Sequence, residues 1–277
     1  MSSIRALVML GLLTLLGVAD GSPQERFFPA VRSFELPEAS PRVHGMVGRV
    51  LSAKRGDSRF GQQQEGEVVL GENFPVVALK RGPHPIVLGI GSQVYGRFSL
   101  ADAKSALISV DWLAGLNATA MLGAWALTLE LYHESSHLGD EYRDRFQISR
   151  LDWSREVMTG WLAYTAGSWR FTGGASYVFL DGLELPRPAA SLGIDFRGSA
   201  SPDGTPSLRP VLGLFTEATS ATRWRLSSSA KLGVVAATPG RSRQFSLALI
   251  VHDGLSTQRQ FFRQESQYVG LEFRFDL

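Results

Sequence analysis

The sequence predicts an all-β fold, namely a transmembrane, antiparallel, up-and-down β-barrel of about 12 strands over residues 43–277. Apolar and polar residues alternate with a period of two along most of this range, as expected when strands present one face to lipid and the other to a lumen. The alternating segments run for about 10–15 residues, whereas globular strands average about five or six. Aromatic residues recur near the segment ends, as in the interfacial girdles of membrane barrels.

The first 21 residues have the anatomy of a secretory signal peptide. Arg5 gives a positive start, an apolar run follows from Ala6 to Val18, and Ala19-Asp20-Gly21 offers small residues for cleavage. The alternative is a membrane anchor, but the run is shorter than the roughly 20 residues that a spanning helix needs. Residues 1–21 are therefore predicted to be cleaved. Residues 22–42, with four prolines, are predicted to form a periplasmic N-terminal arm.

The composition narrows the function classes. The chain has 277 residues, a net charge of +2 and no cysteine, which excludes disulfides and thiolate metal sites. Lys and Arg are scattered, so nothing indicates a nucleic-acid partner. The expected partners are membrane lipids of the outer membrane and the barrel assembly machinery. No cofactor is predicted, and the sequence leaves the oligomeric state open.

The alternation divides the barrel into twelve segments, with ten or fourteen as alternatives. In one of them Trp169, Phe171 and Tyr177 lie on one face, opposed by Arg170 and Thr172 on the other. The predicted strands are 43–54, 66–80, 85–99, 104–118, 121–135, 149–167, 168–182, 187–198, 208–219, 222–236, 243–254 and 266–277.

The last residues alternate without a break to the end of the chain. Val269, Leu271, Phe273, Phe275 and Leu277 share one face. This pattern resembles the C-terminal signal by which outer-membrane barrels are recognised for assembly. That signal usually ends in Phe, and here the last residue is Leu277.

The densest polar cluster is ELYHESSHLGDEY, from Glu130 to Tyr142. The alternation continues into it, so that His133 and Ser135 extend the lipid-facing row while Glu134 points to the lumen. The cluster ends the fifth predicted strand. Because both termini of a bacterial barrel lie in the periplasm, odd strands run outward, and the cluster is expected at the extracellular rim.

Several blocks together resemble a known family. They are VVLGENFPVVAL, VYGRFSL, SVDWLAGL and LYHESSHLGDEY, within residues 65–165. They resemble domain of unknown function 1207, an uncharacterised bacterial family of outer-membrane barrels. The family usually shows Ala-Asp-Pro near the mature N-terminus, where this chain reads SFELPEASP. The resemblance implies a fold and a location but no established activity.

A weaker, local resemblance concerns chemistry. His133-Glu134-Ser135 resembles the His-x-Ser pair that outer-membrane phospholipase A and lipid A 3-O-deacylase carry on the lipid-facing side of a strand. Residues two apart on a strand share a face and lie about 6.6 Å apart along it. The resemblance implies that His133 acts as general base and Ser135 as nucleophile on an acyl ester.

Such a pair needs a third polar group to orient the imidazole. The candidates are Gln147, Asp152 and Glu156. The alternation in this segment assigns Val157 and Trp161 to the lipid face, so Asp152 is out of phase and would need a bulge to reach His133.

The cluster also has structural interpretations. Asp140, Glu141 and Asp144 could bind calcium, or could simply pair with Arg143 and Arg145. Polar side chains near the membrane interface cost only about 0–1 kcal/mol even when charged, so His133 and Ser135 could lie there without a function.

The predicted lumen face carries charges of both signs. Its arginines include Arg97, Arg170, Arg197 and Arg223, and its acids include Asp111, Asp195 and Glu217. They predict a salt-bridged lumen that is either plugged or a narrow pore. Three functions follow: an outer-membrane barrel with a structural, pore or surface role, which we favour from sequence; an outer-membrane lipid esterase; or a soluble exported β-sandwich.

Overall fold

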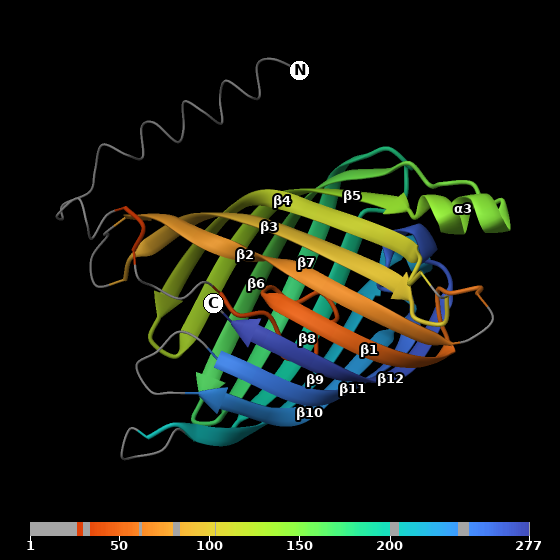
Figure 1. Ribbon diagram of the computed structural model, residues 1–277. Helices are drawn as coiled ribbons and strands as arrows, with labels where there is room; N and C mark the ends of the chain where they lie inside the picture. The colour runs from red at the N-terminus through yellow and green to blue at the C-terminus, as the bar shows by residue number, and fades with distance from the viewer. Residues whose placement is uncertain are drawn as a thin grey trace.

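The computed structural model describes residues 27–29, 34–60, 63–79, 84–102, 104–199, 205–237 and 244–276. Twelve strands form a closed antiparallel barrel in which each strand pairs with its neighbours in sequence and β1 pairs with β12 (Figure 1). The predicted up-and-down barrel and its strand number are confirmed, and a β-sandwich is excluded. The strands are β1 (Met46–Arg55), β2 (Gln64–Leu79), β3 (Ile86–Ser99), β4 (Leu107–Leu122), β5 (Trp125–Leu138), β6 (Trp153–Ala166), β7 (Trp169–Asp181), β8 (Pro188–Arg197), β9 (Ser207–Thr219), β10 (Ser227–Ala237), β11 (Gln244–Leu255) and β12 (Glu265–Asp276).

The outer surface of the barrel is apolar. Large exposed hydrophobic side chains point outward from all twelve strands, which is the reverse of a soluble protein and typical of a lipid-facing surface. The C-terminal row follows this pattern, because Val269, Leu271, Phe273 and Phe275 are exposed; Leu277 lies outside the described residues. In the part of the chain that the structure describes, no helix is long and apolar enough to cross a membrane.

The two ends of the barrel differ. At one end β4 and β5 are joined by a tight turn at Gly123-Ala124, and β6 and β7 by one at Gly167-Ser168. Both glycines have positive φ, of 65° and 60°, which a tight hairpin requires. At the other end the loops are longer and carry α3 (Asp140–Phe146), η1 (Ser220–Thr222) and η2 (Arg259–Phe261). Short turns mark the periplasmic end of a bacterial barrel, so the α3 end corresponds to the extracellular side.

The predicted turn between the fourth and fifth strands was misplaced. We expected the fourth strand to end at residue 118 and the fifth to start at 121. In the structure β4 continues to Leu122 and the chain reverses at Gly123. Residues 119 and 120, which we expected in the turn, continue the ladder, because Thr119 pairs with Thr128 and Ala120 pairs with Leu127.

A segment before β1 fills part of the lumen. Residues 34–45 run inside the barrel, and the side chains of Phe34, Glu38 and Val43 are buried there. The segment is held by backbone contacts: the Tyr95 hydroxyl donates to the carbonyls of Arg42 and Val43, both at 3.3 Å. We expected residues 22–42 to form a periplasmic arm; their described part from residue 34 onward is packed in the lumen. The predicted signal peptide, residues 1–21, lies outside the described residues.

Glycines make room for this segment. A Cβ atom on Gly193 of β8 would lie 2.6 Å from the ring of Pro37, and one on Gly213 of β9 would lie 2.9 Å from the backbone nitrogen of Ala39. A side chain at either position would therefore collide with the segment. The glycines on this part of the lumen face match a chain that packs against it.

Eight alternating charges, which we call the ion ladder, cross the lumen wall from β3 to β8. Arg97 contacts Glu65 at 2.9 Å and Glu67 at 2.7 Å, and Lys231 contacts Glu272 at 2.8 Å and Glu38 at 2.9 Å. In order, the ladder is Glu65, Arg97, Glu67, Arg49, Glu272, Lys231, Glu38 and Arg197. Because Glu38 belongs to the lumen segment, the ladder ties that segment to the wall and joins β1 to β12.

The salt-bridged lumen is confirmed, but most partners differ from the expected acids. Arg97 and Arg197 pair with the glutamates of the ion ladder, and Asp111 pairs with Arg42 of the lumen segment at 2.7 Å. Arg170 stacks over the ring of Phe34, with 4.9 Å from its guanidinium carbon to the ring centroid. Arg223 lies outside the strands, where it ends η1 with φ of 56°. Sequence order could not show that residues 34–42 supply the partners of Arg197, Asp111 and Arg170.

An aromatic cluster closes the extracellular end. Tyr142 of α3 packs against Phe60, Phe146 and Phe261, with ring centroids 4.9 to 5.7 Å apart. The Tyr142 hydroxyl donates to the carbonyl of Asp57 at 2.7 Å. The cluster thus joins the loops after β1, β5 and β11.

The buried carboxyl group of Asp57, in the loop after β1, is expected to make the stability of the fold depend on pH. Burial raises the pKa of its carboxyl group to about 7, with the nearby charge of Glu65 adding to the effect and Arg97 opposing it. A raised folded-state pKa favours folding below the unfolded value of about 4, and that advantage is lost as pH rises toward 7. We expect Asp57→Asn to flatten the fall in stability between pH 4 and pH 8, measured by urea unfolding in lipid vesicles. An unchanged pH profile would contradict this.

Candidate functional site on the outer face of β5

The outer face of β5 carries three polar side chains in one row near the extracellular end. His133 and His137 are exposed and Ser135 is half-buried, whereas the side chains of Glu134 and Ser136 are buried in the lumen. The predicted phase of this strand is therefore confirmed. The row continues the apolar, lipid-facing side chains of Leu127, Leu129 and Leu131.

The pairing with β6 brings an acid to the histidine. Glu156 lies directly opposite His133, and Ser154 lies opposite Ser135. The Nδ1 atom of His133 is 2.9 Å from Oε1 of Glu156, a hydrogen bond between two partly exposed side chains. Of the three candidates for an orienting group, Glu156 is the one that contacts His133.

The other two candidates lie elsewhere. Gln147 ends α3 in a left-handed conformation, with φ of 50°, and its side chain donates to the carbonyl of Asp144. Asp152 is exposed just before β6, and no contact joins it to His133 in the described part of the chain.

The phase that we assigned to β6 was wrong. Val157 is buried in the lumen, and Trp161 turns inward to donate from Nε1 to Glu130 at 3.2 Å. The outward side chains are Met158, Leu162 and Tyr164, in line with Glu156. The prediction failed because a tryptophan is apolar enough to face lipid yet carries an N–H that can donate to a carboxylate in the lumen, here Glu130.

The geometry resembles the base-orienting half of a hydrolytic triad. With Nδ1–H donated to a carboxylate, the imidazole presents Nε2 as the free base. Within the described residues the Ser135 hydroxyl makes no hydrogen bond, so it is available to the neighbouring imidazole. A serine, a histidine and a carboxylate that contacts the histidine therefore lie on the outer face of two adjacent strands, β5 and β6.

The depth of the row is marked by a tryptophan. Trp112 of β4 lies opposite Ser135 in the strand register, and its side chain is 48% exposed on the outer face. Outward tryptophans gather where the hydrocarbon meets the headgroups. Ser135 therefore lies at interfacial depth, which is where the ester bonds of a lipid bilayer are found.

The acidic run of α3 is engaged in ion pairs. Arg143 contacts Asp140 at 3.1 Å and Asp144 at 2.9 Å, while Arg145 contacts Asp102 at 3.2 Å. Among the residues that the structure describes, no group of three or more His, Asp or Glu side chains is arranged to hold a metal ion.

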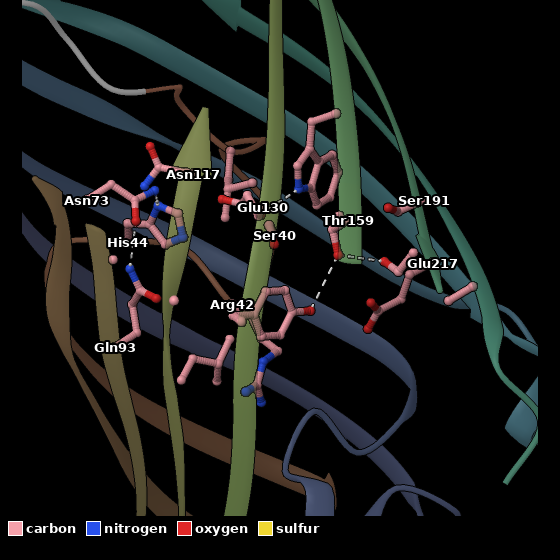
Figure 2. Close-up of a pocket in the computed structure, with 18 of the residues that line it drawn as sticks. Ser40, Arg42, His44, Asn73, Gln93, Asn117, Glu130, Thr159, Ser191 and Glu217 are labelled. Carbon is pink, nitrogen blue, oxygen red and sulfur yellow. Dashed lines mark hydrogen bonds between the residues drawn. The ribbon is translucent and has the colours of Figure 1, made fainter. Parts of the chain in front are cut away.

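The lumen holds a second polar site, a chamber of about 120 Å³ shown in Figure 2. Glu130, Thr159 and Glu217 line it from the strands, and Arg42 reaches it from the lumen segment. Thr159 donates to Ser176 at 3.1 Å, and Glu130 accepts from Trp161. Most polar groups here are bonded to one another, and the chamber contains no serine beside a free histidine, so it is a weaker candidate than the outer row.

The family is shown by comparison with known sequences. The family described as "Protein of unknown function (DUF1207)" matches residues 39–277. The chain belongs to this family. The match includes the whole barrel and the last part of the lumen segment of this DUF1207 protein, and no curated protein sequence matches the chain.

Solved structures similar to this DUF1207 barrel include two outer-membrane phospholipases. The Salmonella typhi outer membrane phospholipase, a dimer with bound calcium, has a TM-score of 0.61 at 14% identity, covering 94% of this chain and 95% of that one. The Escherichia coli outer membrane phospholipase A has a TM-score of 0.59 at 14% identity, covering 87% and 94%. At these identities the likeness shows a shared fold.

Proposed function

We propose that this DUF1207 protein is an outer-membrane acyl hydrolase that acts on membrane lipids at the outer face of β5. The observation that carries the proposal is the 2.9 Å hydrogen bond from His133 Nδ1 to Glu156, two residues along the strand from the unbonded Ser135 hydroxyl. A site that faces lipid suits a substrate that cannot leave the bilayer. Export by a cleaved signal peptide, residues 1–21, and insertion by the barrel assembly machinery belong to the same proposal.

The chemistry follows from the geometry. His133 Nε2 takes the proton of the Ser135 hydroxyl as Oγ attacks the carbonyl carbon of an acyl ester. The imidazolium is stabilised by the Glu156 carboxylate and returns the proton to the departing alcohol oxygen. A water molecule, deprotonated by the same imidazole, then cleaves the acyl-serine ester and releases a fatty acid.

Two further observations support this proposal over a pore. The lumen segment and the residues around η2 occupy part of the lumen, and the ion ladder fixes the segment in place. In addition, the fold is similar to those of two outer-membrane phospholipases. The remaining alternative is a plugged barrel with a structural role, in which the outer row does no chemistry.

The proposal is tested by a fluorophosphonate, which reacts with activated serines. We expect refolded protein in mixed micelles to be labelled at Ser135, identified by peptide mass spectrometry, and Ser135→Ala to remain unlabelled. Ser154→Ala is the matched control, because Ser154 is another outward serine on the neighbouring strand, opposite Ser135. Failure to label, or labelling that persists in Ser135→Ala, would leave the row without a catalytic role.

A further inference from the structure

Beyond Ser135 the outward row of β5 ends in a pair of basic side chains. Nη1 of Arg150, in the loop before β6, lies 3.4 Å from Nδ1 of His137, and both side chains are exposed. Within the described residues Arg150 contacts no carboxylate. The arginines of the adjoining helix differ, because Arg143 and Arg145 each pair with aspartates. Nothing in the local sequence pattern separates Arg150 from Arg143 and Arg145.

The spacing places this pair on the water side of Ser135. His137 is two residues further toward the end of β5, about 6.6 Å along the strand and about 5 Å toward the water once strand tilt is included. Trp112 lies opposite Ser135 and is exposed on the outer face, and an outward tryptophan indicates the interfacial depth at which lipid ester bonds lie. The next layer outward in a bilayer is that of the headgroup phosphates.

We infer that Arg150, together with His137, binds the phosphate group of the lipid whose acyl ester lies at Ser135. The inference rests on the proposed function and names its substrate class: acyl lipids that carry a phosphate close to the ester. A guanidinium matches two phosphate oxygens at once with its parallel N–H groups, and the His137 ring can offer a further donor. Glu156 is hydrogen-bonded to His133, which lies further from the extracellular end than His137. Its carboxylate therefore does not take the place of a phosphate at Arg150.

The basic pair also sets a preference among lipids. A neutral diacylglycerol offers the same ester to Ser135 but nothing to Arg150. Two classes of lipid supply the phosphate, glycerophospholipids and lipid A, and both place it on the water side of acyl esters. Activity toward each of them identifies which one the site uses.

The test compares three substrates in mixed micelles: phosphatidylglycerol, lipid A and diacylglycerol. For Arg150→Ala we expect kcat/KM to fall at least tenfold on the phosphate lipid that wild-type protein hydrolyses best, and less than twofold on diacylglycerol. Arg150→Lys should retain part of the activity. Arg143→Ala is the matched control, since that exposed arginine is nearby but already paired with two aspartates. An equal fall on all three substrates, or no fall, overturns the inference.

A binding measurement separates this inference from the proposed function. Native mass spectrometry of the Ser135→Ala variant in detergent counts bound phosphatidylglycerol or lipid A, with diacylglycerol as reference. We expect phosphate lipids to be retained in preference, and Arg150→Ala in that background to remove the preference. Binding that depends on Arg150 without hydrolysis by wild-type protein would keep the phosphate site and reject the enzyme. Hydrolysis with no role for Arg150 would do the reverse.

Discussion

Ser135→Ala is expected to reduce ester hydrolysis by at least on the order of 10⁴-fold, because the acyl-serine intermediate can no longer form. The variant removes the only hydroxyl of the outward row of β5. Among the described residues, His133 is the only histidine that contacts a carboxylate, through its 2.9 Å hydrogen bond to Glu156. His133→Ala should have a similar effect. Because the two groups act as one unit, the double variant should be no slower than either single one.

The measurement is fatty-acid release from phospholipid micelles, with folding checked by the shift in gel mobility that closed barrels show on boiling. Ser154→Ala should keep near-normal activity. If Ser135→Ala stays active while Ser154→Ala does not, the nucleophile lies on β6 and the assigned roles are wrong. Equal activity in all variants would reduce the row to a structural feature.

Glu156→Gln should give an intermediate loss. The amide oxygen can still accept the Nδ1 proton of His133, so orientation is partly kept, but the charge that stabilises the imidazolium is gone. The fall should appear in kcat rather than in KM, since Glu156 acts through the imidazole and not on the lipid. A pure KM effect would instead make Glu156 a binding residue.

The sequence was sufficient to predict the strands and the outward row because both follow from a local period. The strand number followed from the alternation along residues 43–277, and the phase of β5 followed from the alternation of Leu129, His133 and Ser135. The phase of β6 failed at Trp161, where a hydrogen bond to Glu130 outweighed the apolar character of the indole. The choice of Glu156 over Asp152 depended on strand register, which only the closed barrel defines.

The lumen segment could not be predicted for a related reason. Pro37 and Pro41 suggest a loose arm when residues 34–42 are considered alone. The side chains of Glu38 and Arg42 form ion pairs with residues that are distant in sequence. Lys231 lies 193 residues from Glu38, and Asp111 lies 69 residues from Arg42. Charges that look ordinary in the sequence become fixed in place when burial leaves them few partners other than one another.

That dependence predicts a large loss of stability for Arg49→Met. Arg49, on β1, is buried between Glu67 on β2 and Glu272 on β12, so it lies at the centre of the ion ladder and beside the seam that closes the barrel. Methionine would fill similar space but leave two buried carboxylates short of a counter-charge. Breaking a buried pair in this way costs about 3–5 kcal/mol, far more than an intact pair contributes.

Urea unfolding in lipid vesicles measures this loss, and Arg55→Ala provides the control. Arg55 also joins β1 to β12, through Glu265, but the pair is exposed, and exposed pairs contribute about 0–1 kcal/mol. A loss below about 1 kcal/mol for Arg49→Met would mean that water or Lys231 compensates the carboxylates. A large loss for Arg49→Met with unchanged Arg55→Ala would show that buried charges hold the first and last strands together. The polar side chains of His133 and Ser135 on the outer face would then not be needed to hold the barrel closed.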